Sequence, residues 1–164
     1  MLFTTGEDRY NYIFPMPTQE EHGDESYKLK NAYNTDDLLT FYQENKDGNS
    51  DISIEKNLMF ERDEYTLKVD HNGIFIMASC DDGVFRALTS LRQLIKKGNG
   101  DVIYSDIHDN PEFKQRGFMY DMSRQRKPKP EYIFELIDIM AGMKYNELQL
   151  YIEDLCLKYE AYTE

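Results

Sequence analysis

The chain has few cysteines, fewer basic than acidic residues, and no long apolar run. Its two cysteines, Cys80 and Cys156, are far apart and belong to no Cys-x-x-Cys or Cys/His cluster, so we interpret both as packing residues. The three histidines are equally scattered and lack the spacing of zinc ligands. The sequence therefore predicts no metal site and no cofactor.

The excess of acidic over basic residues restricts the possible partners. The chain contains 19 Lys and Arg against 31 Asp and Glu, which leaves a formal net charge of -12. A surface of this kind repels phosphate backbones and anionic lipids, so we expect no nucleic-acid partner and no membrane partner. No segment approaches the roughly 20 apolar residues of a membrane span, and residues 1–9 do not resemble a secretory leader. On this basis we expect a cytoplasmic location.

Local patterns predict a mixed α and β structure over the first two thirds of the chain. The clearest signal is a β-hairpin, because apolar residues alternate on both sides of His71-Asn72-Gly73. A helix at 84–97 has acidic residues before it, an apolar stripe along it and Gly98 after it. The remaining elements predicted here are strands at 26–29 and 52–54 and a helix at 36–45.

A different pattern begins after the turn at Asp109-Asn110-Pro111. Residues 117–122 form a nearly continuous apolar run, which is typical of a strand buried on both faces. Pro128 and Pro130 then open a helix with an apolar stripe from Ile133 to Ala141, and residues 148–152 form a second strand. Strand, helix and strand at this spacing predict a βαβ unit with parallel strands.

Three segments in this region resemble one enzyme family. They are Gln-Arg-Gly-Phe-Met-Tyr-Asp-Met-Ser-Arg at 115–124, Leu-Ile-Asp-Ile-Met-Ala at 136–141, and Lys-Tyr-Asn-Glu-Leu-Gln-Leu-Tyr-Ile-Glu-Asp at 144–154. In this order and at these separations they resemble the opening of the catalytic barrel in glycoside hydrolase family 20, the β-N-acetylhexosaminidases. Upstream, residues 13–17, 65–78 and 82–95 resemble the accessory domain of that family. Similar accessory domains also precede the barrels of some O-GlcNAc hydrolases and α-glucuronidases, so the downstream segments decide the family.

The resemblance implies a fold of class α+β in two parts. Residues 1–112 would form a mixed, largely antiparallel sheet with two helices on one face, as in the hexosaminidase accessory domain. Residues 113–164 would supply the first strand, helix and second strand of an incomplete (β/α)8 barrel. A complete barrel needs about 200 residues or more, so we expect no enclosed active site within the chain.

Two site residues follow from the resemblance by position. Arg116 matches an Arg that hydrogen-bonds hydroxyls of the terminal N-acetylhexosamine, and a guanidinium fork can hold two neighbouring hydroxyls in fixed geometry. The alternative for Arg116 is a structural salt bridge, for example with Asp121. Asp154 matches an Asp that helps to order the catalytic groups, and its alternative is a loop carboxylate that caps the following segment.

In family 20 the 2-acetamido group of the substrate attacks the anomeric carbon, which makes the family an exception to the two-carboxylate mechanism. The enzyme supplies an adjacent Asp-Glu pair after the fourth barrel strand, and that position lies beyond Glu164. No catalytic residue is therefore expected in this chain. Asp24-Glu25 and Asp63-Glu64 are Asp-Glu pairs by composition only, and we interpret both as solvated charges.

These observations predict an inactive N-terminal fragment of a β-N-acetylhexosaminidase, whose partner is a glycan that contains N-acetylhexosamine. The alternative is a non-catalytic carbohydrate-binding or assembly module that keeps the βαβ unit within its own sheet. Strands with open apolar edges also favour self-association, so a homo-oligomer formed through the exposed barrel strands is a further expectation.

Overall fold

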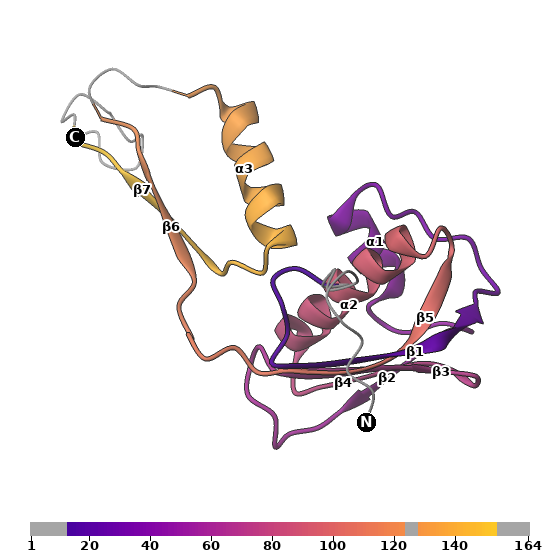
Figure 1. Ribbon diagram of the computed structural model, residues 1–164. Coiled ribbons are helices and arrows are strands. Elements are labelled where there is room, and N and C mark those ends of the chain that lie inside the picture. The colour runs from indigo at the N-terminus through magenta and orange to yellow at the C-terminus, as the bar shows by residue number, and fades with distance from the viewer. Residues whose placement is uncertain (1–12, 124–127, 154–164) are drawn as a thin grey trace, which may run out of the picture. The chain divides into compact units, whose positions relative to one another are not determined.

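Figure 1 shows the computed structural model of the chain, which describes residues 13–123 and 128–153. The chain divides into two compact units, residues 1–112 and residues 113–164. The elements of the first unit are β1 (Gln19–Lys28), α1 (Leu38–Asn45), β2 (Ile52–Lys56), β3 (Tyr65–Asp70), β4 (Gly73–Ala78), α2 (Asp81–Lys97) and β5 (Asp101–Asp109). Those of the second are β6 (Gly117–Asp121), α3 (Pro130–Gly142) and β7 (Glu147–Tyr151).

The first unit contains a five-stranded sheet in the order β1-β5-β3-β4-β2. All neighbouring strands run antiparallel except β2, which pairs in parallel with β4. Strands β3 and β4 form the predicted hairpin, in which Asp70 pairs with Gly73 across a two-residue loop. Gly73 has a φ of 146°, a conformation that residues with a side chain rarely adopt. The strong turn signal in the sequence therefore marks a real hairpin.

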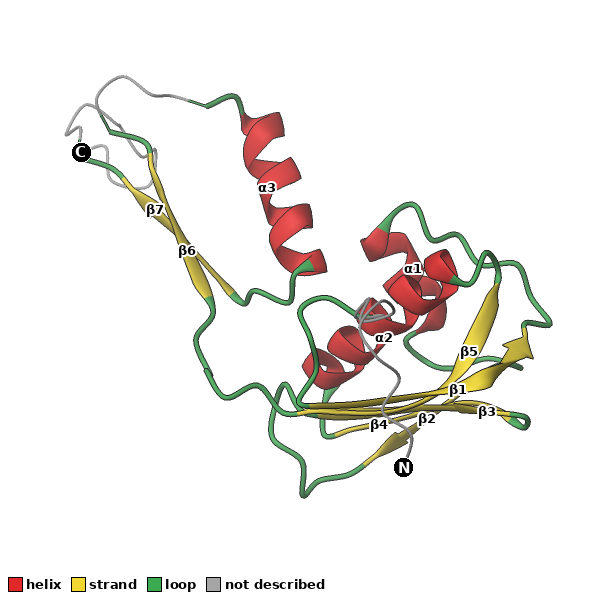
Figure 2. Ribbon diagram, viewed as in Figure 1, coloured by secondary structure: helices red, strands yellow, loops and turns green. Residues whose placement is uncertain are grey.

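Helices α1 and α2 lie on the same face of this sheet (Figure 2). The core forms between them and the sheet, because α2 presents an apolar stripe that includes Leu88, Leu91 and Leu94, each at most 1% exposed. Its acidic first turn and basic last turn match the helix dipole. Helix α1 begins after Asp37, whose carboxylate accepts a hydrogen bond from Thr40 N, so the helix starts two residues later than the predicted start at 36. The predicted α+β class with two helices on one face is confirmed.

Strand β5 is the element that local patterns miss. It pairs with both β1 and β3 and so occupies an interior position in the sheet. Its core-facing positions include the buried polar residues Ser105 and Asp109, which interrupt the expected apolar alternation. Its partner β1 extends well upstream of 26–29 and carries a bulge between His22 and Ser26. A polar edge strand with a bulge gives a weak sequence signal, which explains the shorter prediction.

The second unit is the predicted βαβ unit. Strands β6 and β7 pair in parallel, with Gly117 opposite Glu147 and Asp121 opposite Tyr151. Helix α3 connects them, with Pro130 in its first turn. Within the described residues, no helix of either unit is long and apolar enough to span a membrane.

Candidate functional site

Arg116 lies at the amino end of β6 and is held by the turn that leads into β7. Its Nε donates to Lys144 O at 3.0 Å and its Nη1 donates to Phe113 O at 2.7 Å. Its backbone N–H donates to Asn146 Oδ1 at 2.8 Å, and Asn146 N donates back to Arg116 O at 3.0 Å. The side chain and the backbone of Arg116 thus both bind the α3–β7 turn.

The shape of this turn depends on Lys144. Lys144 is 3% exposed and has a φ of 59°, the left-handed conformation that often follows the end of a helix. The residue after it, Tyr145, donates its N–H to Met140 O at 2.9 Å and closes the end of α3. Asn146 Nδ2 also donates to Lys114 O at 2.8 Å. Together these bonds set the register in which β7 starts beside β6.

The carboxyl ends of the two parallel strands carry a second polar group of residues. Met122 N donates to Tyr151 O at 2.8 Å, so the pairing continues just past β6. Tyr151 Oη donates to Glu153 Oε1 at 2.7 Å, and Asp121 Oδ1 accepts the N–H of Ser123 at 2.8 Å. In barrels of this kind, active sites form at the carboxyl ends of the strands. Asp121, Tyr151 and Glu153 therefore stand at the end where chemistry is expected, and Arg116 stands at the other end of β6.

The charge of Glu153 affects the neighbouring phenol. The hydrogen bond to Glu153 and the negative charge of that carboxylate raise the pKa of Tyr151 above its ordinary value of 10.0, with smaller effects from burial and from the charge of Asp121. Tyr151 consequently keeps its proton at neutral pH and acts as a hydrogen-bond donor.

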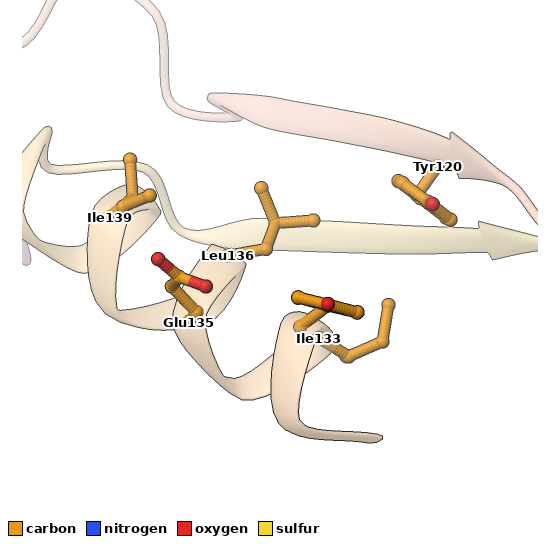
Figure 3. Close-up of a pocket in the computed structure, with 6 residues that line it drawn as sticks. Tyr120, Ile133, Glu135, Leu136 and Ile139 are labelled. Atoms are coloured by element: carbon orange, nitrogen blue, oxygen red, sulfur yellow. The ribbon is translucent and has the colours of Figure 1, made fainter. Parts of the chain in front are cut away.

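A hollow of about 230 Å³ lies on the side of β6 that faces α3 (Figure 3). Its described lining is mainly apolar, and Glu135 is the only carboxylate among the described residues that line it. The lining residues are Tyr120, Tyr132, Ile133, Glu135, Leu136 and Ile139. Because these side chains are suited to packing, we assign the hollow no chemistry.

One of the two upstream acidic pairs differs from the prediction. Asp24 and Glu25 are exposed, as expected for solvated charges. Glu64, in contrast, is only 9% exposed; it accepts the Glu61 N–H at 2.8 Å and lies 2.9 Å from His108 Nε2. Asp63 lies 3.5 Å from Arg86 Nε. The interpretation of Asp63-Glu64 as a solvated pair is therefore wrong, because the two carboxylates link the loop before β3 to β5 and to α2 through polar contacts.

Asp154 and Cys156 lie outside the described residues, so the structure says nothing of their positions. Cys80 is partly buried and its Sγ lies 3.3 Å from Arg62 O. Among the described residues, no group of three or more His, Cys, Asp or Glu side chains is arranged to hold a metal ion.

The sequence contains only weak local signals for the polar residues at the carboxyl end of β7. Glu153-Asp154 follows a predicted strand, which already favours that end of β7. Tyr151 alternates with Leu148 and Leu150, so its side chain belongs to the opposite face of the strand. The hydrogen bond between Tyr151 and Glu153 could not be predicted, because it depends on the backbone path after the strand.

The chain is similar to several known hexosaminidases. It is 31% identical over 109 residues to a beta-hexosaminidase of Vibrio furnissii, and the aligned region covers 65% of this chain and 18% of that protein. It is 29% identical over 158 residues to beta-hexosaminidase subunit A1 of Dictyostelium discoideum, and the aligned region covers 93% of this chain and 26% of that protein. The solved structure of a β-N-acetylhexosaminidase from Bacteroides fragilis matches with a TM-score of 0.70 at 26% identity, over 85% of this chain and 33% of that one. The chain thus spans no more than a third of these proteins.

Family profiles match both units in sequence order. Residues 38–110 match the profile described as Glycosyl hydrolase family 20, domain 2. Residues 113–156 match the profile described as Glycosyl hydrolase family 20, catalytic domain. The boundary between these matches coincides with the boundary between the two compact units. With most of its length matched in this order, and with the mixed sheet followed by a parallel βαβ unit, the chain belongs to glycoside hydrolase family 20.

Proposed function

We propose that this chain is the N-terminal part of a β-N-acetylhexosaminidase that removes terminal N-acetylhexosamine residues from glycans. The reaction is proposed to retain the anomeric configuration and to use the acetamido group of the substrate as nucleophile. The observation that carries the proposal is the pair of consecutive family 20 matches, which follow the order accessory domain and then catalytic domain. The 164 residues by themselves are proposed to be inactive, because the described part of the barrel is a single βαβ unit.

The test of activity uses the purified chain and a nitrophenyl N-acetyl-β-glucosaminide. We expect no release of nitrophenol above the rate measured with buffer alone. The matched positive sample is a longer form of the protein that continues through a complete barrel, which should release nitrophenol. Turnover by the 164-residue chain contradicts the proposed inactivity, and a longer form that is folded but releases no nitrophenol contradicts the proposed activity.

Arg116 and Asp154 stay proposed sugar-site residues. For Arg116 the proposal has a geometric cost, since its guanidinium already donates to two backbone carbonyls at the amino end of β6. A sugar contact has to use N–H groups other than these two, out of the five that a guanidinium carries. Its tight fit in the turn supports a structural role as well.

The two roles of Arg116 can be separated by a pair of variants in the longer form. Arg116→Ala removes the guanidinium, whereas Asn146→Ala loosens the same turn and leaves the guanidinium in place. A sugar contact predicts that only Arg116→Ala raises the KM for the glucosaminide by about tenfold or more, the value expected for one charged hydrogen bond. If Asn146→Ala raises the KM as much as Arg116→Ala does, Arg116 acts only by holding the turn.

A non-catalytic carbohydrate-binding or assembly module is the second candidate function. The self-contained core of the first unit supports it, since this unit needs no barrel to bury its apolar residues. Calorimetric titration of the 164-residue chain with N-acetylglucosamine distinguishes the candidates. Saturable binding that Arg116→Ala abolishes favours the module.

Self-association of the chain is also proposed. In the described residues β6 and β7 pair only with each other, and the unit exposes apolar side chains such as Phe118 at 43% and Leu150 at 42%. Open strand edges and exposed apolar groups favour contacts between copies. Light scattering at increasing concentration should show a rising average mass, and a constant monomer mass contradicts this proposal.

A further inference from the structure

The two faces of the β6–β7 pair differ in chemistry. Tyr120 lies on the face toward α3, where it lines the apolar hollow (Figure 3). Because side chains alternate along a strand and paired residues share a face, Phe118, Leu148 and Leu150 lie on that same face. The opposite face carries Met119 and Asp121 from β6, and Glu147, Gln149 and Tyr151 from β7. One face is therefore apolar, and the other is mainly polar.

The polar face ends in a hydrogen-bonded pair that the packing of the unit does not require. Tyr151 is 39% exposed and Glu153 is exposed, yet the phenol donates to the carboxylate at 2.7 Å. An exposed polar pair contributes little to stability in general. Asp121 lies level with Tyr151 in the register, so a second carboxylate flanks the same ring.

This combination suits a sugar. Ionised carboxylates only accept hydrogen bonds, and the hydroxyls of a pyranose donate them. The ring of Tyr151 offers a flat apolar surface for the C–H groups of a pyranose, with a polar hydroxyl at its edge. All three residues lie at the carboxyl ends of parallel strands, where ligand sites of such folds are built.

We propose that Tyr151 and Glu153, with Asp121 beside them, contact the hydroxyls of the sugar substrate and help to determine which pyranose is accepted. Glu153 accepts a hydrogen bond from a sugar hydroxyl, and Tyr151 holds Glu153 in place and packs against the sugar ring. This inference rests on the proposed function, and it adds residues that the family resemblance does not assign.

The test is an NMR titration of the longer form of the protein, which continues through a complete barrel, with N-acetylglucosamine and, separately, with glucose, which lacks the acetamido group. We expect saturable shifts of the backbone amides of Asp121, Tyr151 and Glu153 with N-acetylglucosamine. Tyr151→Phe and Glu153→Gln should each weaken the apparent affinity by about tenfold, since each removes one hydrogen bond that involves a charged group. The matched control is Glu147→Gln, which lies on the same face at the other end of β7 and should leave the affinity unchanged.

The outcomes separate this inference from the proposed function. Shifts at these amides with N-acetylglucosamine but not with glucose support both. Equal shifts with both sugars support a sugar contact at this site and contradict a preference for N-acetylhexosamine. Absence of saturable shifts at these amides, or equal weakening by Glu147→Gln, overturns the inference, while the nitrophenol assay still decides the function. Tyr151→Phe and Glu153→Gln are each checked for an otherwise unchanged spectrum, so that a folding defect in one leaves the other as the test.

Discussion

At the scale of single residues, Asp51 organises the segment between β1 and α1. It is 3% exposed and accepts hydrogen bonds from the hydroxyls of Tyr27 and Tyr33, both at 2.9 Å. It also accepts the backbone N–H groups of Lys30 and Asn31, each at 3.1 Å. A single buried carboxylate therefore satisfies donors from several parts of the chain, and these bonds hold the loop against the sheet.

Replacement of this carboxylate by an amide should destabilise the first unit. Asp51→Asn turns one acceptor oxygen into an NH2 group that faces N–H and O–H donors, so we expect a loss of roughly 2 kcal/mol in the free energy of unfolding. Urea denaturation at pH 7 measures this loss. Asp24→Asn is the control, because Asp24 is exposed, and its effect should stay within about 0.5 kcal/mol. A loss no larger than that of the control would show that the Asp51 network contributes little.

The same carboxylate should make stability depend on pH. Burial by itself raises the pKa of Asp51, but hydrogen bonds from Lys30, Tyr33, Tyr27 and Asn31 outweigh burial and hold the pKa below its ordinary value of 3.8. The folded state thus binds this proton less readily than the unfolded state, so the contribution of Asp51 is complete above pH 3.8 and is lost as the pH falls through the folded pKa. The difference in unfolding free energy between the wild type and Asp51→Asn should shrink below pH 3.8. A difference that stays constant down to the acid transition contradicts this assignment.

At the scale of elements, helix α2 packs unusually close to the strand end and loop beneath it at Gly83. A Cβ built on Gly83 would lie 2.7 Å from Glu64 O and 2.9 Å from the Cβ of Ala78. Both neighbours are fixed, since Ala78 ends β4 and pairs with Tyr65. Close approach of the helix to the sheet therefore requires glycine at this position.

Gly83→Ala should destabilise the first unit, although alanine favours helices over glycine by about 1 kcal/mol. The clash forces α2 away from β4, and overpacking of this kind typically costs about 1–3 kcal/mol. Gly142→Ala in α3 is the control for an added methyl group, because a Cβ there meets nothing within 4 Å, and it should leave the unfolding transition of the first unit unchanged. Thermal unfolding followed by circular dichroism gives both changes. An increase in Tm for Gly83→Ala would show that the helix can shift without loss.

At the scale of the whole molecule, the two units bury their apolar residues very differently. The first has a continuous core whose members, such as Phe41, Tyr65 and Leu88, are fully buried. In the second, Met140 is the only described apolar side chain that is buried. We therefore expect most of the stability of the chain to reside in residues 1–112.

A shortened chain of residues 1–112 should fold without the second unit. Its amide spectrum should overlay that of the same residues in the full chain, except near residue 112, and its unfolding free energy should agree within about 1 kcal/mol. The matched comparison is a chain of residues 113–164, which should lack a cooperative unfolding transition because its apolar side chains stay exposed. A disordered 1–112 chain would show that the first unit depends on the second.

The amino-acid sequence by itself determined the family, the hairpin, the two-helix pattern of the first unit and the parallel βαβ unit. Each of these follows from local periodicity or from a contiguous motif. Such signals can be seen in the sequence because they depend on residues that are close together in the chain. Strand β5 was not predicted, because the polar residues Ser105 and Asp109 occupy core-facing positions where apolar residues are expected. Their hydrogen-bond partners lie in β1 and next to it, so these positions could be explained only from the tertiary structure. Only the tertiary structure could show that Glu64 is buried, that Arg116 binds the turn of β7, and that Tyr151 meets Glu153. These facts depend on groups brought together by strand pairing and helix packing, and no local pattern specifies such distances.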